Sequence, residues 1–301
     1  MGFLTDSILL GLQYAMLALG VYITFRVLNI PDLTVDGSFT FGIAVSGALT
    51  AAGHPVLGLL LAIAAGAGAG LITGFLQTFA GIHPIVAGIL TMTGLYTINI
   101  TVLGGPNISL IDSDKFFTAA QGLLPYAYRT VVRMAFALLI VAVAVLLLAL
   151  FFKTSYGLSI RATGDNEDMV RASSINTTAT KLTALAIANG LVALSGGVIA
   201  QFQGFADINS GSGMIVVGLA SVIIGEVLFG GRRPLTVGLI SAVVGSVAYR
   251  LIIALALQIN ILNANSLKLI SAVIVGITLA VPAIQKKFPN LKLRRGGQKN
   301  A

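Results

Sequence analysis

The chain has 301 residues, of which 56% are hydrophobic and only 9% charged, with no cysteine and a formal net charge of +8. Soluble domains carry about 25% charged residues, so this composition excludes an ordinary soluble domain. The absence of cysteine excludes disulfides, thiolate metal sites and cysteine nucleophiles. Apolar runs of about 20 residues match the roughly 30 Å hydrocarbon layer of a bilayer. We therefore expect an all-α, polytopic integral membrane protein.

Nine apolar runs are candidates for membrane spans. They lie near 7–28, 37–53, 55–79, 85–103, 130–152, 182–203, 214–229, 235–257 and 267–285. The first lacks a basic leader region and a small-residue cleavage site, which is typical of a retained span. Because 37–53 is short and 104–129 contains apolar pieces that could re-enter the membrane, we expect eight to ten spans and leave the side of the N-terminus open. Residues 1–285 are expected to form one transmembrane domain.

Basic residues gather in the loop 153–181, at Arg232 and Arg233, and in the tail 286–301. Basic segments beside apolar spans mark the cytoplasmic face, and two spans separate each neighbouring pair of these segments. The C-terminus is therefore expected to be cytoplasmic, where its basic tail can contact anionic lipid; a nucleic-acid partner is disfavoured. Glu226 precedes the two arginines closely, which predicts a local ion pair, with docking to a partner as the alternative.

Two short polar segments, 32–38 and 207–213, resemble each other weakly, and each precedes an apolar run. Transporters often carry duplicated, interrupted segments near the substrate path. Counting spans places the two segments on opposite faces, as an inverted repeat requires. Asp36 and Ser38 are thus candidates for a substrate path, although capping of a broken helix is the simpler role for Asp32 and Asp36.

Two helical faces stand out between residues 60 and 105. The run 66–70, followed by Gly74, forms a ridge of small residues that favours close helix packing within the chain over a dimer face. Farther along, polar residues recur at helical spacing on one face. Hydrogen bonds to neighbouring helices and the lining of a path for a polar solute are both open readings of that face. These residues are Thr93, Tyr96, Thr97 and Thr101.

The loop 153–181 is the longest charged segment between apolar runs. Gly157 and Gly164 interrupt the helical pattern, and either Asp165 or Asn166 can cap a new helix. We expect a short helix over 165–174 that lies along the membrane face.

The charged residues of the helix expected over 165–174 favour its formation, and its apolar residues could contact a partner. Glu167 lies in its first turn, where the helix dipole favours negative charge, and Arg171 follows at the supportive i,i+4 spacing. Met169 and Val170 are expected to be available for burial in a partner. A solvated connector is the alternative.

The sequence GLSIRATGDNEDMVRASSIN in this loop closely resembles the cytoplasmic loop of branched-chain amino-acid-type ABC permeases. The family pattern Gly-x-x-x-Arg-Ala-x-Gly-x-Asn is matched by Gly157, Arg161, Ala162, Gly164 and Asn166. The resemblance extends through NIPDLTVDGSFTFG and IGEVLFGG and covers nearly the whole chain, whereas Ser174 departs from the usual Gly. The early motif looks most like the branch paired with binding proteins for tryptophan or tyrosine.

This resemblance implies the permease of an importer in the bacterial inner membrane. An external binding protein would deliver an amino-acid-like solute to two permease subunits, expected to be two copies of this chain. Two cytoplasmic ATPases carrying ATP and Mg would bind the coupling helix. The implied coupling residues are Gly157, Arg161, Ala162, Gly164, Asp165, Asn166, Glu167, Met169, Val170 and Arg171.

The chain itself is not expected to be an enzyme or to hold a cofactor. It contains no Gly-Lys dipeptide and therefore no P-loop of the G-x-x-x-x-G-K-[ST] type. A sugar or nucleoside permease of the same family is an alternative. An ion-coupled secondary transporter is another, although such proteins usually need a buried carboxylate or a broken-helix ion site. A membrane enzyme is disfavoured because no catalytic constellation appears.

Overall fold

The computed structural model describes residues 2–122, 128–230, 234–258, 273 and 276. Long helices dominate this part of the chain, and the two strands form one short antiparallel pair in which Ile108 lies opposite Ala206. The elements are α1 Gly2–Gln13, α2 Ala15–Tyr22, the π-helix η1 Ile23–Val27, α3 Val35–Ala51, α4 Pro55–Thr78, α5 Pro84–Leu103, β1 Asn107–Ser109, α6 Thr118–Gly122, α7 Arg129–Phe151, α8 Ser155–Asp165, α9 Glu167–Ala172, α10 Thr177–Gln203, β2 Phe205–Asp207, the 3-10 helix η3 Ile208–Gly211, α11 Met214–Phe229 and α12 Leu235–Gln258.

Seven helical segments among the described residues are long and apolar enough to cross a membrane. Helix α3, with 17 residues, is shorter than these but packs beside α4, α5 and α10. The predicted all-α polytopic fold is confirmed, and the expected run 267–285 lies outside the described residues except for Val273 and Gly276.

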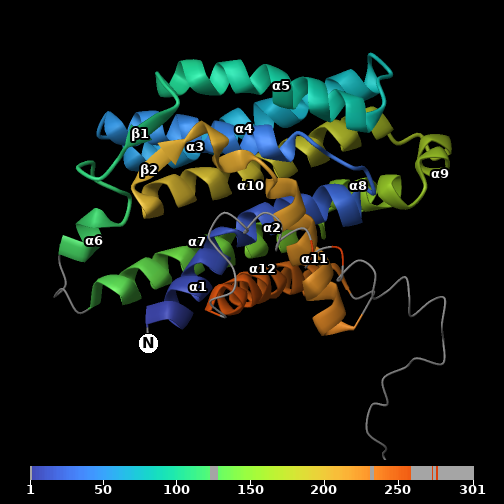
Figure 1. The fold of residues 1–301 in the computed structure, drawn as a ribbon. Helices are drawn as coiled ribbons and strands as arrows, with labels where there is room; N and C mark the ends of the chain where they lie inside the picture. The colour runs from blue at the N-terminus through green and yellow to red at the C-terminus, as the bar shows by residue number, and fades with distance from the viewer. Residues whose placement is uncertain (1, 123–127, 231–233, 259–272, 274–275, 277–301) are drawn as a thin grey trace, which may run out of the picture.

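The long helices lie roughly side by side, with α10 near the middle and α5 along one outer edge (Figure 1). Helices α8 and α9 lie at one end, which we call the α9 end. The N-terminus, α6 and the β1–β2 pair lie at the opposite end, which we call the strand end (Figure 1). The first span therefore starts at the strand end and reaches the α9 end at η1.

Glycine spacing explains how closely α4 packs against the central helix α10. A Cβ on Gly66 would lie 2.4 Å from the carbonyl oxygen of Asn189, and one on Gly70 would lie 2.2 Å from that of Leu185. Because only glycine permits this backbone approach at these positions, the predicted packing of the small-residue ridge within the chain is confirmed.

The two similar polar segments touch each other. The carboxylate of Asp36 accepts hydrogen bonds from the backbone N–H groups of Gly213 and Ile215, both at 2.8 Å. The expectation that segments 32–38 and 207–213 lie on opposite faces is therefore wrong. Residues 204–213 return from the strand end, so that α11 begins beside the first turn of α3 (Figure 1).

Candidate functional site

A cavity of about 350 Å³ lies beside the middle of α5, and we call it the central pocket. Helices α3 and α5 and the turn around η3 form its walls. Its lining residues are Asp36, Gly37, Thr40, Met92, Thr93, Tyr96, Asn99, Ile208, Asn209, Gly211 and Ser212. Backbone from both polar segments thus borders one cavity halfway along the long helices.

Asp36 joins the pocket to the start of α11. Its two carboxylate oxygens accept the N–H groups of Gly213 and Ile215, which are among the backbone donors that a helix N-terminus leaves unpaired. Gly213 has φ +84°, a conformation that favours glycine. Asp36 therefore caps a helix, as the simpler reading suggested, but that helix is α11 and not its own.

Asn99 carries an unsatisfied polar atom at the pocket wall. The residue is 2% exposed, its Nδ2 lies 3.4 Å from the carbonyl oxygen of Gly37, and its Oδ1 has no partner among the described residues. A buried amide oxygen without a donor is costly unless something else supplies one. Asn99 follows Tyr96 by three residues, so the helical spacing that predicts the polar face of α5 also places Asn99 next to that face.

The predicted polar face of α5 is only partly in the pocket. Thr93 and Tyr96 line it, whereas Thr97 and Thr101 are exposed on the same helix outside the lining. The Thr93 hydroxyl donates to the carbonyl oxygen of Ile89 at 2.8 Å, and the Thr101 hydroxyl donates to that of Thr97 at 2.9 Å. Tyr96 is 54% exposed, and its hydroxyl makes no hydrogen bond among the described residues.

Ser38 does not line the central pocket. It is fully buried and donates to Oδ1 of Asn189 at 2.7 Å, so its hydroxyl is directed into the protein interior. Asn189 also donates to Asp32 at 2.7 Å, and Asp32 accepts the N–H of Thr34 at 2.9 Å. Asp32 therefore holds the turn before α3, within a buried network, but the N-cap position of α3 belongs to Thr34 and has no side-chain cap.

At the α9 end, helices α8 and α9 form an elbow, defined here as residues 155–172. The Thr154 hydroxyl accepts the N–H of Gly157 at 3.1 Å, and the Asn166 side chain accepts the N–H of Met169 at 3.0 Å. Asn166, rather than Asp165, is thus the cap of the second helix. That helix spans Glu167–Ala172, which is shorter than the expected 165–174.

The expectation that Gly157 and Gly164 interrupt the helix is wrong, because α8 runs through both. A Cβ on Gly164 would lie 1.9 Å from the carbonyl oxygen of Val27, and one on Gly157 would lie 2.3 Å from that of Phe151. Both glycines therefore permit close packing of α8. Ala162 and Arg161 lie between them, and Arg161 is exposed.

The apolar residues of α9 point in different directions. Met169 is 61% exposed, but Val170 is 1% exposed and packs inside the chain. The expectation that Val170 is available to a partner is therefore wrong, and Met169 is the outward-facing apolar residue.

The predicted Glu167–Arg171 pair forms at 3.0 Å, and Lys181 adds a second contact to Glu167 at 2.6 Å. The hydrogen bond from Lys181, together with the nearby charge of Arg171, lowers the pKa of the Glu167 carboxyl.

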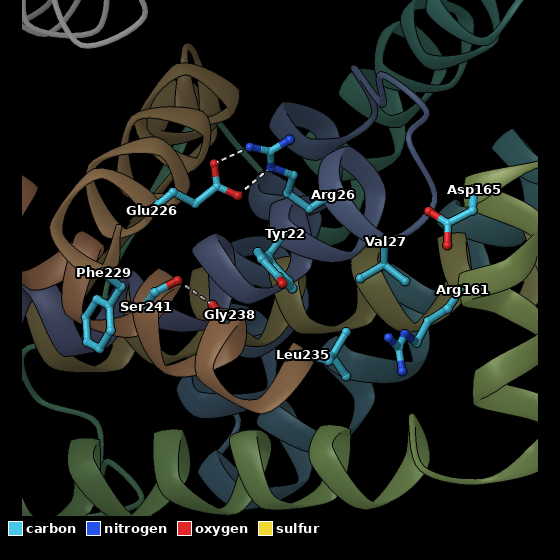
Figure 2. Close-up of a pocket in the computed structure, with 10 residues that line it drawn as sticks. All are labelled: Tyr22, Arg26, Val27, Arg161, Asp165, Glu226, Phe229, Leu235, Gly238 and Ser241. Atoms are coloured by element: carbon cyan, nitrogen blue, oxygen red, sulfur yellow. Dashed lines mark hydrogen bonds and ion pairs between the residues drawn. The ribbon is translucent and has the colours of Figure 1, made fainter. Parts of the chain in front are cut away.

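A second cavity, the α9-end pocket, has a volume of about 220 Å³. Arg26 of η1 forms a bidentate ion pair with Glu226 of α11 at its edge (Figure 2). Glu226 thus pairs with Arg26, whereas the partners that the sequence predicts for it, Arg232 and Arg233, lie outside the described residues. The pocket is lined by Tyr22, Arg26, Val27, Arg161, Asp165, Glu226, Phe229, Leu235, Gly238 and Ser241.

Comparison with known proteins agrees with this architecture. The chain is 38% identical to the tyrosine transport system permease protein of Clostridioides difficile, over 96% of this chain and 94% of that protein. It is 35% identical to an uncharacterized protein of Rickettsia prowazekii, over 71% of this chain and 73% of that one. Identity to the autoinducer 2 import system permease LsrC of Yersinia enterocolitica is 33%, over 77% of this chain and 61% of that protein.

No solved structure is significantly similar to the chain. The family model for the permease component of branched-chain amino acid transport systems matches residues 3–281, nearly the full length of the sequence. The long apolar helices and this match together make the protein a multi-pass protein of the inner membrane. The chain belongs to the family of branched-chain amino acid transport system permeases.

Proposed function

We propose that this chain is the permease subunit of an ATP-driven importer and forms half of the path for an amino-acid-like solute, with an aromatic amino acid as the first candidate. An external binding protein would deliver the solute, and cytoplasmic ATPases would drive its release. The relative that is named a tyrosine transport system permease supports the aromatic substrate.

The central pocket is the observation that carries the proposal. Its α5 residues, Met92 to Asn99, lie in the middle of a span that runs from Pro84 to Leu103. No cationic side chain of the described residues lines it, and the charge of Asp36 is compensated by the start of α11. Amides and hydroxyls without strong net charge offer a polar solute hydrogen bonds and still let it leave.

The outward face of α5 supports a dimer. Tyr96 is exposed on the chain's surface at membrane depth, where lipid cannot satisfy its hydroxyl, which has no hydrogen-bond partner among the described residues. A second copy related by a two-fold axis, the commonest closed assembly, would cover this face and complete the path. We propose that the partner is an identical chain.

The elbow supports ATPase docking. It lies at the end of the molecule opposite the N-terminus, and it presents the exposed Met169 beside a charged rim (Figure 1). In this proposal the α9 end and the basic tail face the cytoplasm, and the strand end faces the binding protein.

A solute other than an amino acid is the second candidate. The relative named as an autoinducer 2 import permease favours it, and the amides and hydroxyls in the lining of the central pocket can hydrogen-bond solutes of other classes.

Cysteine accessibility tests the path, since the chain has no native cysteine. Single cysteines at Thr93 and Tyr96 should react with a charged, membrane-impermeant thiol reagent in the reconstituted complex, and saturating solute should slow the reaction. The matched control is Leu146 of α7, which is 58% exposed on an apolar surface and should react only with a lipid-soluble reagent. Identical behaviour at all three positions would mean that the α5 face contacts lipid.

A further inference from the structure

The α9-end pocket is separate from the central pocket and has its own charge pattern. Among the described residues, four charged side chains line it, two of each sign. Arg26 and Glu226 neutralise each other through their bidentate contact (Figure 2). This pair also joins the first span to α11, so one wall of the pocket is held together by charge.

The other two charges come from α8 and are not paired. Arg161 and Asp165 are exposed, and neither side chain makes an ion pair or hydrogen bond within the described part of the chain. Figure 2 shows both side chains extending from α8 toward the same space near Val27. Residues four apart on a helix have neighbouring side chains, with Cβ atoms about 5–6 Å apart. The pocket therefore presents one free positive and one free negative group close together.

We propose that the α9-end pocket binds a zwitterionic amino acid. Its carboxylate pairs with the guanidinium of Arg161, and its ammonium group pairs with the carboxylate of Asp165. A ligand with only one charged group would leave either Arg161 or Asp165 without a partner, so the pocket selects for ligands that carry both charges. The volume of about 220 Å³ is below the roughly 300–1,000 Å³ of pockets for drug-sized ligands, which suits a single amino acid.

The location gives this site a regulatory role, which rests on the proposed function. The cytoplasmic end of an importer meets the accumulated product. A product molecule held by α8 would bridge it to the first span and α11, and α8 leads directly into α9. Occupancy would hold the elbow in one position and slow further import. The site is thus a product sensor on the permease itself.

Ligand fluorescence provides a direct test because the chain contains no tryptophan. L-Tryptophan is titrated with the full chain in lipid nanodiscs, and its fluorescence anisotropy is measured. Tryptamine lacks the carboxylate, and indole-3-propionate lacks the ammonium group. L-Tryptophan should bind at least about tenfold more tightly than either analogue, which corresponds to one charge-assisted contact of about 1.4 kcal/mol.

Charge-removing variants assign the two contacts. Arg161→Gln should lower the affinity for L-tryptophan to that for tryptamine, and Asp165→Asn should lower it to that for indole-3-propionate. Arg161→Lys keeps the charge and should retain most of the binding, which separates a contact from a folding defect. The control Leu146→Ala changes α7, outside the lining of both pockets, and should leave this binding unchanged.

Two results would overturn the inference. One is wild-type affinity for L-tryptophan in both Arg161→Gln and Asp165→Asn; the other is equal affinity of the wild-type chain for L-tryptophan, tryptamine and indole-3-propionate. Uptake of labelled tyrosine and tryptophan by the reconstituted complex tests the proposed function separately. Uptake without binding at this pocket rejects the sensor, whereas binding without any ATP-driven uptake of a solute rejects the importer.

Discussion

The carboxylate of Asp36 accepts the backbone N–H of Gly213 at 2.8 Å, although the two residues lie 177 positions apart. The contact joins the first turn of α3 to the start of α11 and closes one wall of the central pocket. A single side chain thus couples the beginning of a helix to the cavity that we propose as the solute path.

Replacing Asp36 tests this coupling. Asp36→Ala removes the cap of α11 and should destabilise the protein by about 0.5–2 kcal/mol, the usual loss for a capping residue. Asp36→Asn keeps an acceptor and should retain most of the stability. Thermal unfolding of the detergent-purified variants measures the difference, and equal melting temperatures for Asp36→Ala and wild type would argue against a cap.

Substitution of Asn99 should reduce solute uptake without reducing the stability of the fold. Asn99→Leu removes the unsatisfied buried Oδ1, so the fold should be unchanged or more stable. If the amide contacts the solute, uptake should fall by up to about tenfold, because a lost hydrogen bond costs roughly 0.5–1.5 kcal/mol. Leu95→Met, at a buried position of the same helix, is the control and should transport normally.

Met169 should be the residue that contacts the ATPase. Met169→Asp adds charge to an exposed position, so it should leave membrane insertion and binding-protein recognition intact while weakening ATPase co-purification. Val170→Asp would instead bury a charge inside the chain and should loosen the elbow itself. Substrate-stimulated ATP hydrolysis by the reconstituted complex is the readout, and full stimulation in Met169→Asp would exclude this face from coupling.

Ser174 has φ +61°, in the left-handed region where related permeases are expected to carry glycine. A non-glycine residue there costs roughly 1–2 kcal/mol, partly offset by the greater freedom of glycine in the unfolded chain. Ser174→Gly should therefore stabilise the link between α9 and α10 by up to about 1 kcal/mol, and Ser174→Val should destabilise it. Hydrogen-exchange protection at residues 170–178 measures both effects.

The contribution of Glu167 to the stability of the folded state should depend on pH. Its pKa lies below the ordinary 4.5 because Lys181 and Arg171 favour the carboxylate. The Glu167 carboxyl therefore binds a proton less readily in the folded state than in the unfolded state. Its stabilising contribution is fully present above about pH 4.5 and is lost as pH falls through the lowered pKa. Protection factors in α9 should differ between wild type and Glu167→Gln at pH 7 and converge in acid. A pH-independent difference would assign the effect to packing.

Local features of this protein could be read from its sequence because they depend on near neighbours. Helical spacing predicted the Glu167–Arg171 pair, capping preference predicted Asn166 as one of two candidates, and small-residue spacing predicted the close packing of α4. Apolar runs long enough to cross a bilayer predicted the polytopic fold, since hydrocarbon thickness sets their length.

Contacts between distant segments required the tertiary structure. Nothing in the local pattern pairs Arg26 with Glu226, 200 positions away, or brings Asp36 to α11. Helical spacing also could not show that Val170 points inward while Met169 points outward, because which face of α9 is covered depends on how α8 packs. The glycines of α8 look like helix breakers in isolation and become packing positions only where the backbone of Val27 and Phe151 lies against them.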